Sequence, residues 1–238
     1  MTEIDGLLLL DKPAGCTSHD LVDRVRRKFG IKKVGHCGTL DPQATGLLML
    51  LLGKATKMQA LLMAEDKTYR GTMRLGVITD TQDADGKIIE ERPVPDIDPK
   101  IIEAAFERYR GDFYQTPPMV SALKKDGVPL YKLARKGLVV EREPRLVHVY
   151  WSQIIKIDLP RVEFELRCSK GFYVRTYCDD IGKFIGTGAC LEKLCRTASG
   201  NFRLDQAISW EKCEALDSLS ALKPYIISPA EVSRIRRQ

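Results

Sequence analysis

The sequence predicts an α+β fold, in which strands and helices follow one another and share a substantial core. Three observations lead to this prediction. Residues 47–52 are apolar without interruption, a run too short for a membrane span and suited to a buried strand. Thr17 and Asp20 form a capping-box pattern before a segment with helical apolar spacing. Residues 146–159 and 162–168 predict two antiparallel strands, the second alternating apolar and charged side chains.

Composition excludes several classes of protein. The chain has 238 residues, of which 44% are hydrophobic and 29% charged, as in ordinary globular proteins. Acidic residues precede the first leucine run, so neither a signal peptide nor a transmembrane segment is predicted. The seven cysteines are odd in number and form no C-x-x-C pair, which argues against a zinc site and a disulfide framework. We therefore expect a cytoplasmic protein.

The other elements follow from periodicity and from glycine and proline punctuation. Strands are expected at residues 6–10, 69–79 and 87–92, and helices at 17–30, from Asp98-Pro99 to Gly111, at 130–136, from Tyr173 toward Gly186, at 188–197 and once after Ser209. Asp85-Gly86 predicts a hairpin turn. A calcium loop is improbable there, because Thr81 and Arg92 would occupy its first and last ligand positions.

Positive charge is concentrated in two segments. The net charge is +6, compatible with a nucleic-acid partner without proving one. Residues 24–33 hold six basic and no acidic residues, and a solvated helix face is the alternative to phosphate contact. Residues 121–145 hold seven basic and three acidic residues, a net of 7 − 3 = +4. We expect this second segment to clamp an RNA backbone.

A single acid stands at the centre of residues 35–57. Pro42 biases Asp41 away from helical conformation, and the loop leads directly into the apolar run. By itself this pattern is compatible with a simple turn. A phosphate-binding loop is excluded, because six residues separate Gly46 from Gly53 and neither Ser nor Thr follows Lys54.

Several separated stretches, spanning about residues 5–205, together resemble the bacterial TruB-type tRNA pseudouridine synthases. The matching motifs are Asp11-Lys12-Pro13-Ala14-Gly15 with Thr17-Ser18; Gly35-His36, Gly38-Thr39-Leu40-Asp41-Pro42 and Ala44-Thr45-Gly46; Tyr69, Leu75-Gly76 and Thr79-Asp80-Thr81; Pro117-Pro118, Ser121-Ala122 and Lys124; Tyr131, Ala134-Arg135 and Gly137; Cys168-Ser169-Lys170-Gly171, Tyr173 and Arg175; and Asp180, Gly182, Gly186, Gly188 and Ala189. One such motif is weak, whereas several in the family's order and spacing are specific.

The resemblance implies the pseudouridine synthase fold, with a central, mostly antiparallel mixed sheet flanked by helices and a catalytic cleft. It implies conversion of the T-loop uridine of tRNA (position 55) to pseudouridine without cofactor or metal. Separately, we expect the chain to be a monomer. The alternatives are a tRNA-folding chaperone with secondary catalysis, or a pseudouridine synthase that acts on another RNA.

The resemblance also implies roles for single residues. Asp41 matches the nucleophile, Tyr69 the tyrosine that stacks on the target base and relays or accepts its C5 proton, and Arg175 the arginine that pairs with the aspartate. An arginine partner suits the chemistry, because guanidinium stays charged and binds carboxylate through two donors. Four further residues match substrate-binding positions: Tyr173 and Leu194 in the uracil pocket, His36 at the flipped T-loop, and Lys12 beside the catalytic loop.

Three features depart from the family pattern. Cys37 stands where a smaller or hydroxylated residue is usual, and Val120 replaces an aromatic residue. Family members usually carry a C-terminal RNA-binding domain of the PUA kind. We expect this chain to be a single catalytic domain over residues 1–238, with 206–238 as a short extension and no PUA domain. Weaker tRNA binding than in longer relatives is therefore expected, with recognition of an isolated T-arm retained.

Overall fold

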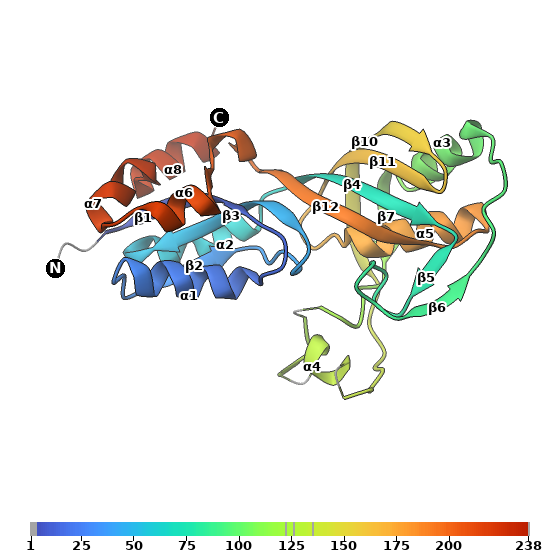
Figure 1. Cartoon of the computed structure of the whole chain (residues 1–238), viewed down its shortest axis with the longest axis horizontal. Helices are drawn as coiled ribbons and strands as arrows, with labels where there is room; N and C mark the ends of the chain where they lie inside the picture. Colours follow the sequence, from blue (N-terminus) through green and yellow to red (C-terminus); the bar gives the residue numbers. More distant parts are fainter. Residues whose placement is uncertain (1–3, 122, 126, 135, 238) are drawn as a thin grey trace. The chain divides into compact units, whose positions relative to one another are not determined.

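A computed structural model of the chain describes residues 4–121, 123–125, 127–134 and 136–237. Figure 1 shows the course of the chain and its elements. The chain divides into two compact units, which are described separately. The first unit comprises residues 1–69 and 194–238, and the second comprises residues 70–193. Two strands, β4 (Lys67–Leu75) and β12 (Ala189–Ser199), contribute residues to both units.

The first unit combines a sheet with short helices. Its elements before the second unit are β1 (Gly6–Lys12), α1 (Ser18–Lys28), β2 (Val34–Cys37), β3 (Thr45–Leu52), η1 (Gly53–Met58) and α2 (Gln59–Met63). Those after it are β13 (Phe202–Arg203), η2 (Leu204–Gln206), β14 (Ile208–Ser209), α6 (Trp210–Ala215), α7 (Leu219–Leu222), η3 (Lys223–Tyr225), β15 (Ile226–Ile227) and α8 (Pro229–Arg236). The strand order is β14-β1-β3-β12, with β2 beside β3, β13 beside β12 and β15 beside β1.

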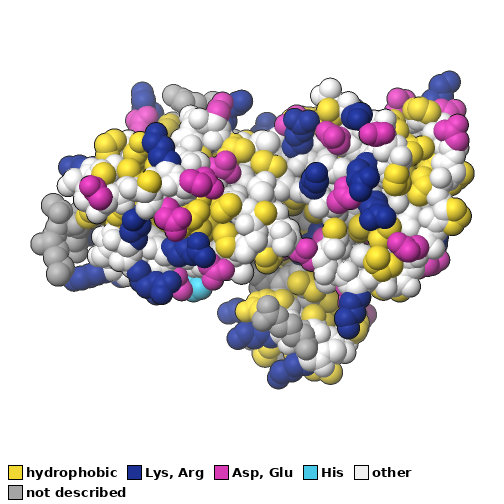
Figure 2. Space-filling view, in the orientation of Figure 1, with side chains coloured by type: hydrophobic (Ala, Val, Ile, Leu, Met, Phe, Trp, Pro, Cys, Tyr) yellow, Lys and Arg dark blue, Asp and Glu magenta, His cyan; other side chains and the backbone are white. Residues whose placement is uncertain are grey.

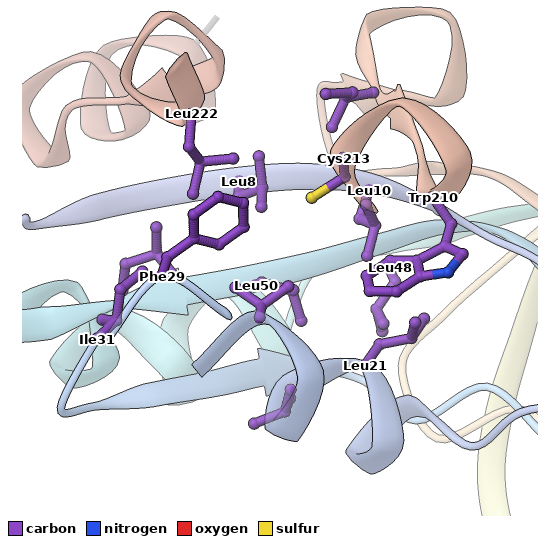
Figure 3. Packing of buried hydrophobic residues seen from close by; sticks show 14 residues of the cluster. Leu8, Leu10, Leu21, Phe29, Ile31, Leu48, Leu50, Trp210, Cys213 and Leu222 are labelled. Carbon is purple, nitrogen blue, oxygen red and sulfur yellow. The ribbon is translucent and has the colours of Figure 1, made fainter. Parts of the chain in front are cut away.

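Burial on both faces explains the apolar run of β3. Successive side chains of a strand point to opposite faces of its sheet. On one face Leu48 and Leu50 join Leu8 and Leu10 of β1 in a core with α1, α6 and α7, as Figure 3 shows. Leu47, Met49 and Leu51 belong to a second core that includes Phe202 and Val232. The predicted buried strand is therefore confirmed, and its pairing with β1 is antiparallel.

The second unit packs two helices against an antiparallel set of strands. Its elements are β5 (Val77–Thr79), β6 (Ile88–Glu91), α3 (Pro99–Arg108), β7 (Gly111–Gln115), β8 (Lys124–Lys125), β9 (Val128–Pro129), α4 (Leu130–Ala134), β10 (Arg145–Asp158), β11 (Arg161–Cys168) and α5 (Val174–Ile185). The strands follow the order β4-β11-β10-β7. Phe106 of α3, Phe164 of β11 and Tyr177 of α5 form an aromatic cluster that joins helices to sheet, with edge-to-face contacts of Phe106 to the other two rings.

These elements confirm most of the predicted ones. The mostly antiparallel α+β sheet is as expected, with parallel pairing between β1 and β14 and between β3 and β12. The capping box of Thr17 and Asp20 is present, and β5 and β6 form the predicted hairpin. The prediction of α4 extended to Lys136; the structure describes the helix over Leu130–Ala134 and places Lys136 in a turn. Ala122, Asp126 and Arg135 of the sequence prediction lie outside the described residues.

Two predictions were wrong. Residues 188–197 were expected to be helical, but residues 189–197 belong to β12. There Cys195 and Arg196 pair with Thr45 and Gly46 of β3, and this pairing overrides local propensity. The tail after Ser209 was expected to hold one short helix, but it contains α6, α7 and α8.

Candidate active site

Asp41 lies in the loop between β2 and β3 of the first unit. Its side chain is half-buried, and its carbonyl accepts a hydrogen bond from the amide of Ala44 at 3.1 Å, which closes a tight turn. Gly46, just after the loop, has φ +97°, and a Cβ there would lie 2.4 Å from the carbonyl oxygen of Arg196. Only glycine fits this close approach of two strands. The loop is therefore fixed where it enters the core.

The side chain of Lys12 binds the backbone of this loop. The side chain is fully buried, and Nζ donates to the carbonyls of Pro42 at 2.9 Å, Ala44 at 2.7 Å and Pro13 at 2.9 Å. An ammonium group has three donors, so all of its hydrogen-bonding capacity is used. Two of the three acceptors, Pro42 and Ala44, follow Asp41 in the loop. Lys12 thus positions the loop from inside the protein.

Two further side chains fix the same loop. The hydroxyl of Ser18 accepts from the amide of Leu40 at 2.9 Å and lies 3.2 Å from its carbonyl oxygen. The guanidinium of Arg196, which is 1% exposed, donates from Nε to the carbonyl of Leu47 at 2.7 Å and from Nη2 to that of Gly38 at 3.1 Å. Side chains from β1, α1 and β12 therefore hold the backbone around Asp41 on both sides.

Burial and charge together set the protonation of this region. Burial lowers the pKa of Lys12, while nearby Cys16 and the Asp41 carboxylate oppose that shift. Burial also lowers the pKa of His36, and the positive charge of Arg196 adds to this effect, so His36 is neutral at pH 7. Burial raises the pKa of the Cys37 thiol to about 12, so this cysteine is not a thiolate nucleophile.

Three other predicted residues belong to the first unit. His36 lies on β2, paired with Leu50, and its buried Nδ1 has no hydrogen-bond partner among the described residues. Tyr69 is half-buried on β4. Leu194 lies on β12, and its carbonyl accepts from the hydroxyl of Thr45 at 3.3 Å. Asp41, Lys12, His36, Tyr69 and Leu194 are therefore all provided by one compact unit.

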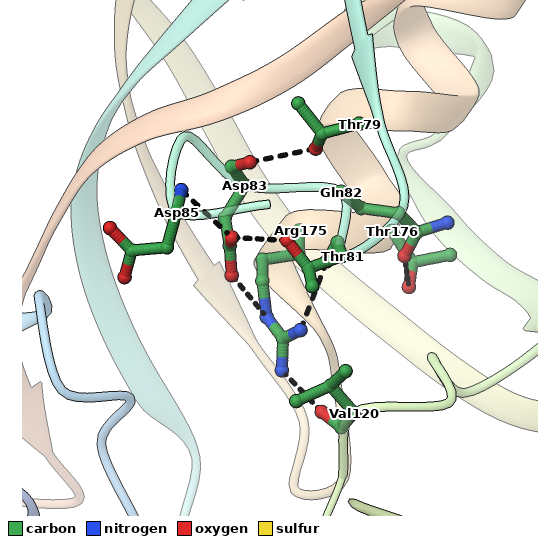
Figure 4. A network of polar contacts seen from close by, with 8 residues as sticks. All are labelled: Thr79, Thr81, Gln82, Asp83, Asp85, Val120, Arg175 and Thr176. Atoms are coloured by element: carbon green, nitrogen blue, oxygen red, sulfur yellow. Dashed lines mark hydrogen bonds and ion pairs between the residues drawn. The ribbon is translucent and has the colours of Figure 1, made fainter. Parts of the chain in front are cut away.

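Arg175 lies in the second unit, near the start of α5, and is only 4% exposed. Its guanidinium donates to the carbonyl of Thr81 at 3.1 Å and to that of Val120 at 2.8 Å, and Nε lies 3.6 Å from a carboxylate oxygen of Asp83 (Figure 4). Asp83 itself accepts from the hydroxyl of Thr81 and from the amide of Asp85. The arginine is thus held in one orientation. Its predicted pairing with Asp41 stays a prediction.

Tyr173 precedes α5 in the second unit, and its backbone is bound by Gln115 of β7. The side-chain amide of Gln115, 2% exposed, accepts from the Tyr173 amide at 2.8 Å and donates to its carbonyl at 3.1 Å. These two bonds fix the backbone from which the ring of Tyr173 projects.

Sequence reasoning missed several of the residues that hold this site. Arg196 was overlooked because its segment was predicted to be a helix. Asp83 was considered only as part of a calcium loop or a turn, although an acid in a loop next to a buried arginine is the signal that could have identified it. In the described part of the chain, no group of three or more His, Cys, Asp or Glu is placed to hold a metal ion.

Exposed basic side chains accompany the segment that carries α4. They are Lys124, Lys125, Lys132, Lys136 and Arg145, and Figure 2 shows basic residues on this segment. On α1, Arg24 lies over the ring of Trp210 at 5.6 Å, and Arg26 pairs with Asp23 at 2.9 Å. Part of the predicted basic helix face therefore already has intramolecular partners. No helix within the described ranges is long and apolar enough to cross a membrane.

Comparisons with known proteins agree with these motifs. A family model described as TruB family pseudouridylate synthase (N terminal domain) matches residues 26–174, and one described as tRNA pseudouridylate synthase B C-terminal domain matches residues 175–232. A tRNA pseudouridine synthase B of Opitutus terrae is 53% identical over 90% of this chain and 89% of the relative. Its counterpart in Geobacter sulfurreducens is 46% identical over 96% of this chain and 75% of the relative.

Solved structures show a similar fold. In a Cbf5-Nop10-Gar1 complex, one chain is 31% identical to this one with a TM-score of 0.67, over 87% of this chain and 52% of that chain. A chain of an H/ACA RNP bound to a substrate RNA is 28% identical with a TM-score of 0.65, over 87% of this chain and 51% of that one. The family models, the curated relatives and the fold agree, and the chain belongs to the TruB family of pseudouridylate synthases.

Proposed function

We propose that the chain converts the T-loop uridine of tRNA, at position 55, to pseudouridine. The observation that carries this proposal is the fixed loop of Asp41, whose backbone is bound by the buried cations Lys12 and Arg196. A carboxylate held in one place is what attack at a single sugar carbon requires. The names of the relatives support tRNA as the RNA acted upon.

The reaction is an isomerisation, so atoms balance within one nucleotide. The bond from N1 of uracil to C1′ of the ribose breaks, the base turns, and a bond from C5 to C1′ forms. C5 loses a proton and N1 gains one. In this proposal Asp41 acts at the sugar, as nucleophile or as the base that forms a glycal, and Tyr69 stacks on the base and relays or accepts the C5 proton. Arg175 pairs with the aspartate and keeps it ionised.

The remaining predicted residues bind the RNA. Tyr173 and Leu194 line the uracil pocket, and His36 supports the extruded conformation of the loop. A base inside a folded loop must be flipped out, at a cost of a few kcal/mol, which contacts elsewhere must offset. We propose further that the chain is a single catalytic domain that acts in the cytoplasm. We also propose that it is a monomer, which sedimentation of the purified chain tests.

The decisive experiment measures tritium release from C5-labelled uridine in an unmodified tRNA T-arm, with wild type and Asp41→Asn side by side. Release by the wild type alone supports both the reaction and the nucleophile. Tight binding without release by either protein contradicts the proposal, and favours a tRNA-folding chaperone or a different RNA substrate.

The basic segment around α4 is the candidate clamp for the RNA backbone. We expect Lys124→Glu combined with Lys132→Glu to weaken T-arm binding at least tenfold. The slope of log Kd against log salt concentration should also fall, by an amount that corresponds to the loss of about two phosphate contacts. Lys223→Glu, at an exposed lysine of η3, is the matched control and leaves the salt dependence unchanged. Equal salt slopes for wild type and the double variant would exclude the clamp.

A further inference from the structure

Gln82 has a backbone conformation that is unusual for its residue type. With φ of +65°, it is the one residue other than glycine with positive φ in the described part of the chain. The left-handed region is unfavourable for an L-residue, so surrounding contacts must maintain it. Its two neighbours in sequence, Thr81 and Asp83, both contact the guanidinium of Arg175.

The side chain of Gln82 makes two hydrogen bonds to α5, the helix that carries Arg175. Its Nε2 donates to a carboxylate oxygen of Asp179 at 2.8 Å, and its Oε1 accepts from the hydroxyl of Thr176 at 2.9 Å. The bond to Thr176 is visible in Figure 4. A carboxylate only accepts, so the amino group of the amide must face Asp179 and its oxygen must face Thr176. The amide therefore has one orientation.

The backbone of Gln82 is fixed as well. Its amide donates to the carbonyl of Thr79 at 3.3 Å, and its carbonyl accepts from the amide of Leu191 on β12 at 3.0 Å. Ala84, two residues on, donates to the carbonyl of Leu191 at 2.9 Å. The loop thus pairs with β12 through its backbone and with α5 through the side chain of Gln82.

These contacts close a ring of bonds. It runs from the Arg175 guanidinium to Thr81, along the backbone to Gln82, through the Gln82 amide to Thr176, and back along α5 to Arg175. Thr176 and Asp179 are 4% and 5% exposed, so losing the amide leaves buried polar groups without this partner. The ring fixes the distance between the loop and the helix.

We propose that Gln82 is a positioning residue for the isomerisation: its side-chain amide joins the Thr81–Asp83 loop to α5 and so orients the guanidinium of Arg175. The inference rests on the proposed function, which assigns Arg175 to pair with the nucleophile. Asparagine is one methylene too short to reach both partners from the same backbone, and leucine forms neither bond. Glutamate would bring a second carboxylate against Asp179.

The test uses the tritium-release assay with the full chain. We expect Gln82→Leu to lower kcat about 10- to 100-fold while KM for the T-arm stays within twofold. The reason is that the substitution displaces the Arg175 guanidinium, which acts after binding. Ile102→Val, at a fully buried position of α3, is the control: it lowers the stability of the fold and leaves kcat unchanged. If a general loss of stability were the cause, kcat would fall in both variants alike.

A complementary exchange separates positioning from packing. Gln82→Glu alone places two carboxylates together and lowers kcat, and adding Asp179→Asn restores a donor opposite an acceptor. Asp179→Asn also removes the 2.6 Å ion pair of Asp179 with Lys183, and the single variant measures that effect. Recovery of kcat in the double variant to within about fivefold of wild type supports the proposal, also where Gln82→Leu fails to fold. Additive losses in the double variant, or a normal kcat in Gln82→Leu, overturn it. An inactive wild type would instead contradict the proposed function, so the two failures are distinguishable.

Discussion

Replacing Lys12 with methionine tests whether the loop of Asp41 depends on a buried cation. Methionine fills a similar volume but donates no hydrogen bond, so three backbone carbonyls lose their ammonium partner. Each bond to a charged donor contributes about 1.5 kcal/mol or more. Removing a buried ammonium also removes its desolvation cost, which offsets part of the sum. We expect a net loss of about 3 kcal/mol in the free energy of unfolding.

The pH dependence gives the same substitution a second signature. Burial lowers the pKa of Lys12 in the folded state, below the value of about 10.4 that lysine has in an unfolded chain. Between these two pKa values the unfolded chain binds more protons, so the wild type gains stability as pH rises. Lys12→Met lacks this contribution. The difference in unfolding free energy between the two proteins should therefore grow from pH 7 toward pH 10.

Urea unfolding at several pH values measures both effects, and tritium release reports on the loop. The release rate should fall about 100-fold, because the carboxylate is no longer held in place. Lys57→Met, at an exposed lysine of η1, serves as control and should change stability by less than about 0.5 kcal/mol. A loss below about 1 kcal/mol for Lys12→Met, equal at every pH, would refute the assigned role of the buried ammonium.

Two further substitutions test the electrostatics and the backbone of the site. Burial raises the pKa of Asp180 on α5 to about 6, so the protonated form favours folding below about pH 4 and this contribution is lost as pH rises through 6. Asp180→Asn should thus be more stable than wild type at pH 8, by about 1 kcal/mol given the partial exposure, and the gain should vanish at pH 4 in thermal unfolding. Gly46→Ala should cost about 3 kcal/mol, since its Cβ would meet backbone at 2.4 Å, whereas Gly30→Ala, with φ +62° in open space, should cost about 1 kcal/mol; equal losses would contradict the close approach.

Local signals in the sequence were sufficient for most of the fold. The run at residues 47–52 predicted a buried strand, because all six of its side chains are apolar and both faces of such a strand need to be covered. The capping box at Thr17 and the Asp98-Pro99 start fixed the beginnings of α1 and α3, where a side-chain oxygen or a proline meets the first helical turn. These signals act within a few residues, so they are readable without knowledge of the rest of the chain.

The strand β12 shows where such local reasoning fails. Its residues have helical spacing and helix-forming side chains, yet pairing with β3 makes them extended. The error also concealed Arg196. In a strand, Leu194 and Arg196 point to the same side, whereas a helix separates them by more than half a turn. The contact of Arg196 with the backbone of the Asp41 loop could therefore not be predicted from the sequence.

Backbone acceptors explain why the rest of the site could not be predicted from residue types. Lys12 binds three carbonyls, Arg196 binds two, and Arg175 binds those of Thr81 and Val120. A carbonyl oxygen is present at every position, so these contacts leave no mark on the acceptor's side chain. The departure at Val120 has a physical account on this basis: its carbonyl, not its side chain, binds the arginine. A cation that recognises backbone conformation tolerates variation in the residue it contacts, while the cation itself has no equivalent substitute.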